Sequence, residues 1–150
     1  MLAWRLTPSR HAATALTGYG AALYGGRWNR QGAAVVYLSA SLALATLEVV
    51  VHLTGGLLSH TAIALELPDH EIDELPIDGL PGGWENDEPV TQAIGGEWLG
   101  RRRLALAVPS ALVAPRALAE RNLLIDPSHP SWSAIREVDR FETEIDARLV

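Results

Sequence analysis

The chain has 150 residues, of which 48% are apolar and 20% charged, and it contains no cysteine. This length and composition predict one soluble domain, residues 1–150, with a sizeable core, and the lack of cysteine excludes a disulfide framework, a thiolate nucleophile and cysteine-ligated zinc. A net charge of −6 disfavours non-specific nucleic-acid binding, which depends on a basic surface.

No segment of the sequence has the pattern of a secretory signal or a membrane span. The N-terminal MLAWRLTPSR lacks the apolar stretch of a signal peptide. The longest apolar run, 42–53, is interrupted by Thr46, Glu48 and His52, and it is shorter than the roughly 20 residues that cross a bilayer. We therefore expect a cytoplasmic protein without a membrane-spanning segment.

The first half of the chain alternates between strand-like and helix-like runs. In chain order, the patterns predict a short extended segment at 4–6, a turn of helix or a loop at 9–18, a strand at 33–38 and a helix at 42–53. Ser39 and Ser41 are both candidate N-caps of that helix, and Gly55-Gly56 is its expected stop. The strand follows directly on GGRWNRQG, residues 25–32, in which glycines enclose an arginine and a tryptophan.

The second half is interrupted by a long acidic segment. The patterns predict a strand at 61–67, an irregular surface connection at 69–88, a helix at 90–99, a strand at 103–113 broken at Pro109, a strand at 122–127 and a last strand at 141–150. The basic cluster Arg101–Arg103 is expected at the C-terminus of the helix before it. These elements favour an α+β fold with a mixed or mostly antiparallel sheet.

One carboxylate stands out against its surroundings. Glu48 lies in LALATLEVVVHL, a helix that is apolar on nearly every face, and a buried carboxylate is costly unless it is paired or hydrated. Two interpretations remain open at this point. Either Glu48 pairs with His52 at the helix surface, or it faces a cleft as a functional carboxylate.

Three further residues are candidates for a functional site, each with a structural alternative. Arg27 follows Gly25-Gly26, so it is either a phosphate or carboxylate ligand or a turn residue in solvent. Tyr37 is near the end of its strand and is also a plausible core residue. Ser110 follows the strand-breaking Pro109 without the Gly-x-Ser-x-Gly motif of an acyl-transfer nucleophile. It is either an orienting hydrogen-bond donor or a simple bulge residue.

Other chemistries lack their motifs. The five histidines show no close metal-binding pairing, and there is no phosphate-binding Gly-x-x-x-x-Gly-Lys loop. The dinucleotide fingerprint Gly-x-Gly-x-x-Gly is also missing. Asn122, with Asp126-Pro127 and His129-Pro130 after it, is interpreted as turn chemistry.

The ordered set of motifs resembles the RES-domain family, the toxins of RES–Xre toxin–antitoxin pairs, named for an arginine, a glutamate and a serine. The matching motifs are Trp4-Arg5, GGRWNRQG at 25–32, VVYLS at 35–39, LATLEVVVH at 44–52, GGEWL at 95–99, AVPSALV at 107–113, NLLIDPSHP at 122–130 and DARLV at 146–150. They run over essentially the whole chain in the family's order.

The resemblance implies an ADP-ribosyltransferase-like fold, with a mixed or antiparallel β core and flanking helices. It implies NAD⁺ as the substrate, with no metal, and nicotinamide release by hydrolysis or by phosphorolysis. The implied partner is an Xre-like helix-turn-helix antitoxin in a hetero-oligomer, so any DNA contact would come from the partner.

The resemblance also implies roles for individual residues. Arg27 would contact the cofactor phosphates with help from Arg5, and Tyr37 would flank the nicotinamide ring. Glu48 would lie near the nicotinamide–ribose bond, with Ser110 in the same cleft. The implied catalytic set is Arg27, Tyr37, Glu48 and Ser110, and the implied cofactor-binding set is Arg5, Arg27, Asn29 and Tyr37.

The residue types agree with this chemistry. Breaking the N-glycosidic bond gives the ribose oxocarbenium character, which a nearby carboxylate stabilises. Nicotinamide leaves as a neutral base, so no strong general acid is needed. A transferase that passes ADP-ribose to a protein would use the same residues. A non-catalytic nucleotide-binding module on the same fold is the alternative from another class.

Overall fold

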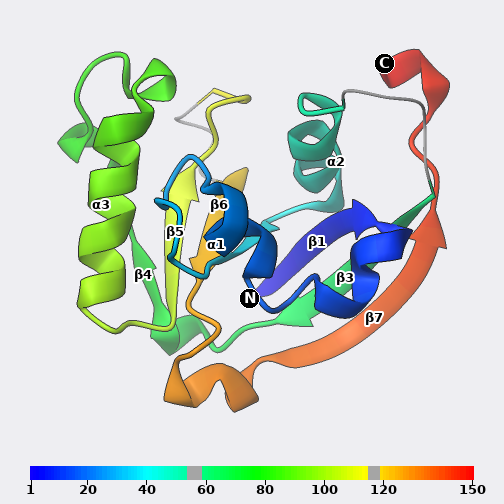
Figure 1. Ribbon diagram of the computed structural model, residues 1–150, viewed down its shortest axis with the longest axis horizontal. Helices are drawn as coiled ribbons and strands as arrows, with labels where there is room; N and C mark the ends of the chain where they lie inside the picture. Colours follow the sequence, from blue (N-terminus) through cyan, green and yellow to red (C-terminus); the bar gives the residue numbers. More distant parts are fainter. Residues whose placement is uncertain (54–58, 115–118) are drawn as a thin grey trace.

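The protein is built on one seven-stranded sheet with the strand order β4-β5-β6-β2-β1-β3-β7. The computed structural model describes residues 1–53, 59–114 and 119–150. Figure 1 shows α1 in front of the middle of the sheet, α2 above β1, and α3 beside β4 and β5.

The strands are β1 (Leu2–Pro8), β2 (Val36–Ser39), β3 (His60–Glu66), β4 (Ile72–Glu74), β5 (Ala105–Pro109), β6 (Arg121–Ile125) and β7 (Arg136–Thr143). The α-helices are α1 (Tyr19–Tyr24), α2 (Leu42–Val50) and α3 (Glu88–Gly100). Short 3₁₀ helices cover Ser9–Thr14, Asp69–Glu71, Ile77–Gly79, Trp84–Asn86, Pro130–Ala134 and Ala147–Leu149.

The sheet is mostly antiparallel. The short edge strand β4 runs parallel to β5, whereas the other neighbours in the sheet are antiparallel. β1 pairs with β3 from end to end, and its pairing with β2 is the bridge between Trp4 and Ser39. The predicted α+β architecture with a mixed sheet is therefore confirmed.

Alternation along the central strands divides the core between two faces. On β6, Leu123 and Ile125 belong to one apolar cluster, and Leu124 between them belongs to another. This is the period of two that a strand imposes when both of its faces are covered. The second cluster contains three buried tryptophans, Trp28, Trp84 and Trp98.

The helix α2 begins as its sequence predicts. Ser41 is the N-cap, and its hydroxyl oxygen accepts a hydrogen bond from the amide of Leu44 at 3.1 Å. Ser39 is instead the last residue of β2 and lies buried. The helix ends at Val50, and the expected stop at Gly55-Gly56 lies outside the described residues.

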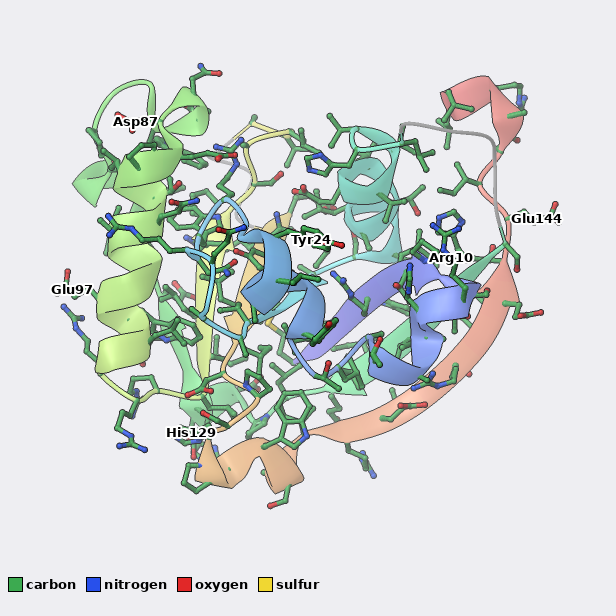
Figure 2. The ribbon with its side chains drawn as sticks, in the orientation of Figure 1. Arg10, Tyr24, Asp87, Glu97, His129 and Glu144 are labelled. Atoms are coloured by element: carbon green, nitrogen blue, oxygen red, sulfur yellow. The ribbon has the colours of Figure 1, made fainter. Side chains whose placement is uncertain are left out.

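The helix α3 is longer at both ends than predicted. Asp87, labelled in Figure 2, accepts a hydrogen bond from the amide of Val90 at 3.2 Å and caps the first turn. The helix runs through Gly95 and Gly96 without a break, and Arg101 forms its C-cap. The prediction that the Arg101–Arg103 cluster ends this helix is confirmed.

Two predictions of secondary structure were wrong. The 69–88 segment is not irregular, because it contains β4, three 3₁₀ turns and the buried Trp84. The last strand lies at 136–143 and not at 141–150, because pairing with β3 selects the charged run REVDRFET. The short helix α1 lies within the stretch 19–24, for which no element was predicted.

Candidate active site

The carboxylate of Glu48 lies where α2 meets the ends of β5 and β6. Its Oε1 accepts a hydrogen bond from the hydroxyl of Ser110 at 3.0 Å. The same oxygen accepts a second hydrogen bond from the side-chain amide of Asn122 at 2.5 Å. Three elements far apart in the sequence therefore converge on one oxygen atom of Glu48.

This arrangement distinguishes between the two interpretations of Glu48. In the described part of the chain, the hydrogen bonds and ion pairs include none between Glu48 and His52. The side chain is half-buried and turns toward the sheet. The Glu48–His52 surface pair is therefore not formed.

Ser110 is fixed by its position after β5. Pro109 ends the strand, and Ser110 is 1% exposed. Its Oγ accepts a hydrogen bond from the amide of Leu112 at 3.0 Å, so its own proton is directed to Glu48. The serine is thus an orienting donor in the structure, one of the two alternatives that its sequence left open.

Asn122 is the residue that the sequence interpretation assigned wrongly. It lies inside β6, 8% exposed, and not in a turn. Its Oδ1 accepts a hydrogen bond from the hydroxyl of Ser39, its cross-strand partner on β2, at 2.8 Å. The sequence did contain a signal that could have identified Asn122, namely a carboxamide at the start of the apolar run NLLI. Such a residue on a buried strand needs polar partners.

A second group of polar residues surrounds Tyr37 on β2. The phenol oxygen accepts a hydrogen bond from the amide of Trp28 at 3.1 Å and donates one to Oδ1 of Asn29 at 2.7 Å. Burial raises the pKa of Tyr37 to about 12. The hydroxyl therefore remains neutral near pH 7 with its proton already committed, and the ring is the part of Tyr37 that is left for a ligand.

The GGRWN turn is shaped around this tyrosine. A Cβ added to Gly26 would lie 2.8 Å from the phenol oxygen of Tyr37 and 2.8 Å from Oδ1 of Asn29, so only glycine fits there. Asn29 is 1% exposed and donates hydrogen bonds to three backbone carbonyls of the surrounding chain. Its polar atoms are thus used internally. Trp28 is buried in the core beneath.

Arg27 points out of this turn toward the 3₁₀ helix that precedes α3. Its Nη1 donates a hydrogen bond to the carbonyl of Glu85 at 2.7 Å. Among the described residues the guanidinium donates to no other group. Since a guanidinium carries five N–H donors, most of them remain available for an anion.

Arg5 approaches the same strand from β1. Its Nη1 donates a hydrogen bond to the carbonyl of Tyr37 at 3.2 Å, and its buried Nε has no partner among the described residues. Burial lowers the pKa of the Arg5 guanidinium, which the nearby Tyr37 partly opposes. A buried cationic group with an unused donor is costly, so an anion at this position would relieve it.

The residues around Glu48 and those around Tyr37 are joined by β2. Tyr37 and Ser39 are two residues apart and thus project from the same face of the strand. At about 3.3 Å of rise per residue, their Cα atoms are about 7 Å apart. The ring of Tyr37 and the Ser39–Asn122–Glu48 contacts are therefore neighbours along one short strand.

Neither a metal centre nor a membrane helix is found in the described ranges. No group of three or more His, Cys, Asp or Glu side chains within 1–53, 59–114 and 119–150 is placed to hold a metal ion. In these same ranges, every helix is too short or too polar to cross a bilayer.

The chain belongs to the RES-domain family. The family model described as "RES domain" matches residues 2–146. The protein "Toxin Res" of Photorhabdus laumondii is 38% identical, covering 100% of this chain and 97% of the relative. The "Prs ADP-ribosylating toxin" of a Sphingobium species is 39% identical, covering 98% of this chain and 95% of the relative.

A solved structure has the same fold. A chain in the crystal structure of the M. tuberculosis MbcT–MbcA toxin–antitoxin complex superposes with a TM-score of 0.73, covering 95% of this chain and 83% of that one. The sequence identity is 17%, so this likeness concerns the fold. It agrees with the α+β, ADP-ribosyltransferase-like architecture that the sequence resemblance implied.

Proposed function

We propose that this protein is a toxin of a toxin–antitoxin pair that cleaves the bond between nicotinamide and ribose in NAD⁺. The arrangement of Glu48 is the observation that carries the proposal. Its Oε1 is held by Ser110 and Asn122, whereas Oε2 accepts no hydrogen bond from the described residues. A carboxylate on a rigid support, with one free oxygen, suits the stabilisation of positive charge on a ribose.

The bond that breaks joins C1′ of the ribose to N1 of nicotinamide. The electron pair of this bond passes to N1, which neutralises the pyridinium, so no proton is needed on the leaving group. Positive charge develops on C1′ and the ring oxygen of the ribose, near the free oxygen of Glu48. Water or inorganic phosphate then forms the new bond to C1′; attacking water loses its proton to solvent.

The other residues would bind the substrate. The guanidinium of Arg27, with its unused donors, would contact the pyrophosphate, and Arg5 would add positive charge from β1. The ring of Tyr37 would flank the nicotinamide, since its hydroxyl is already bonded within the protein. Because the polar atoms of Asn29 are used internally, we assign it the role of holding Tyr37.

Transfer of ADP-ribose to a protein is the second candidate. It is favoured by the name of the Sphingobium relative, an ADP-ribosylating toxin that is 39% identical. Transfer and hydrolysis share the first step at C1′ and differ in the nucleophile that follows. Both would depend on Glu48 in the same way.

An antitoxin is the proposed partner. The relatives are named toxins, and the structure that shares the fold was solved as a toxin–antitoxin complex. An antitoxin of the Xre type is the partner that the motif resemblance implies. Co-expression with the product of the adjacent gene and analytical ultracentrifugation test whether the two form a stable complex.

The test of the function is nicotinamide release from NAD⁺ by the purified, partner-free protein. Release is measured by chromatography with and without phosphate, for the wild type and for Glu48→Gln, which keeps the shape and the acceptor oxygen. We expect a loss of about 10²–10³-fold in kcat for the variant, the usual effect of removing a transition-state electrostatic contact. Phosphate dependence separates phosphorolysis from hydrolysis.

Two outcomes would redirect the proposal. If nicotinamide is released only when a cell lysate is added, and labelled NAD⁺ leaves its label on a protein, transfer is favoured. Binding of NAD⁺ without release or labelling would leave a nucleotide-binding module. Equal release by the wild type and Glu48→Gln would refute the role of Glu48.

A further inference from the structure

A buried serine stands behind the asparagine that holds Glu48. Ser39 on β2 and Asn122 on β6 are 4% and 8% exposed and stand opposite each other in the sheet register. The hydroxyl of Ser39 donates to Oδ1 of Asn122 at 2.8 Å, and Nδ2 of Asn122 donates to Oε1 of Glu48 at 2.5 Å. The three side chains form one chain of hydrogen bonds.

The direction of this chain follows from the atoms. A carboxylate only accepts hydrogen bonds, so the amide nitrogen of Asn122 must face Glu48 and its oxygen must face Ser39. Ser39 is then obliged to donate. Rotation of the amide by half a turn would place its oxygen 2.5 Å from the carboxylate oxygen, where two acceptors repel each other. The hydroxyl of Ser39 therefore favours the one amide orientation that supports Glu48.

The two donors to Glu48 have different origins. Ser110 lies on the loop after β5, whereas Asn122 lies within a buried strand and is held from behind. A strand position allows less displacement than a loop position. The Asn122 bond is thus the more rigid of the two contacts to Oε1.

We infer that Ser39 and Asn122 are positioning residues that fix the carboxylate of Glu48 so that its second oxygen faces the ribose. This inference rests on the proposed NAD⁺ cleavage; it adds Ser39 to the site and gives Asn122 a positioning role. Neither residue touches the substrate. Their effect is expected on the chemical step and not on substrate binding, because their side-chain hydrogen bonds join them to each other and to Oε1 of Glu48.

The first test is Ser39→Ala, with nicotinamide release measured over a range of NAD⁺ concentrations. We expect kcat to fall about tenfold, the value of one hydrogen bond of typical strength, and KM to change less than twofold. Ser39→Thr keeps the hydroxyl and should recover most of the activity. Ser131→Ala is the matched control, because its hydroxyl also donates a hydrogen bond to another side chain, the carboxylate of Glu71 at 3.0 Å, away from the site.

The second test is Asn122→Asp, which changes the amide nitrogen to an oxygen with almost no change in volume. Two carboxyl groups would then share one short contact, so one of them holds a proton up to a higher pH. We expect the acid limb of the kcat–pH profile to move up by one pH unit or more. A purely structural role of Asn122 would lower activity at every pH without moving this limb.

The outcomes separate the inference from the function on which it rests. If the wild type releases no nicotinamide, the proposed function fails. If the wild type is active, and folded Ser39→Ala protein keeps the wild-type kcat or loses activity through KM alone, the inference is overturned. A wild-type pH profile for Asn122→Asp overturns it independently, even if Ser39→Ala does not fold.

Discussion

The packing of α3 against the GGRWN turn predicts that alanine lowers the stability of the protein at Gly95 and raises it at the adjacent Gly96. A Cβ added to Gly95 would lie 1.8 Å from the carbonyl oxygen of Trp28 and 2.8 Å from its carbonyl carbon. Contacts this short do not occur, and the obstacle is backbone that cannot rotate away. A Cβ added to Gly96 meets no atom within 4 Å.

The structure sets the size of the effect. To accept Gly95→Ala, helix and turn must separate by more than 1 Å, and overpacking of this kind costs about 1–3 kcal/mol. The separation also strains two hydrogen bonds between α3 and the turn, from Thr91 to the carbonyl of Arg27 and from Gln92 to the carbonyl of Gly26. Their loss adds about 1 kcal/mol each. We therefore expect a free energy of unfolding lower by about 3 kcal/mol or more.

Thermal unfolding followed by circular dichroism measures both variants. At 150 residues, about 3 kcal/mol corresponds to a fall of roughly 6–12 °C in Tm for Gly95→Ala. Gly96→Ala should instead raise Tm by a few degrees, since alanine is favoured over glycine inside a helix by up to about 1 kcal/mol. A Gly95→Ala protein that melts at or above the wild-type temperature would refute the close approach of helix and turn.

Two further predictions concern Tyr37 and the cap of α2. The pKa of Tyr37 is raised to about 12. The contribution of its neutral hydroxyl to the free energy of unfolding is therefore fully present below pH 10 and is lost between about pH 10 and pH 12. The free energy of unfolding should fall over that window by on the order of 2–3 kcal/mol; this loss should vanish in Tyr37→Phe and persist in Tyr19→Phe, whose side chain is exposed. Ser41→Ala removes the N-cap of α2 and the hydrogen bond to Glu120, so urea denaturation should show a loss of about 1 kcal/mol; an unchanged denaturation midpoint would contradict the cap.

The strands and helices that the sequence predicted share a local signal. The buried runs at 36–39, 60–66 and 121–125 are rich in apolar, strand-forming residues, and α2 has both a cap and a helical pattern. The two errors lack such a signal. β4 is a strand only because its three residues pair with β5, and β7 is an exposed edge strand whose residues are mostly charged. Pairing with distant segments decides both, and it leaves little trace in local composition.

The site shows the same division. Glu48 and Ser110 were identified because each broke a local rule, as a carboxylate in an apolar helix and a serine after a strand-ending proline. Asn122 was missed because asparagine near Asp-Pro and His-Pro is typical of turns, a local preference that the buried β6 overrides. Its contact with Glu48 spans 74 positions in the sequence. Only the fold brings such residues together.

The distribution of unused hydrogen-bonding groups matches the charges of the proposed substrate. Buried polar side chains need hydrogen-bond partners, and the protein itself supplies them for Ser39, Ser110 and Asn122. Among the described residues of the site, free capacity remains on one oxygen of Glu48 and on the arginine guanidinium groups, those of Arg27 and Arg5. NAD⁺ carries a cationic pyridinium–ribose at one end and an anionic pyrophosphate nearby, so it would satisfy both kinds of group at once. A simple anion would engage only the arginines, and a simple cation only the glutamate.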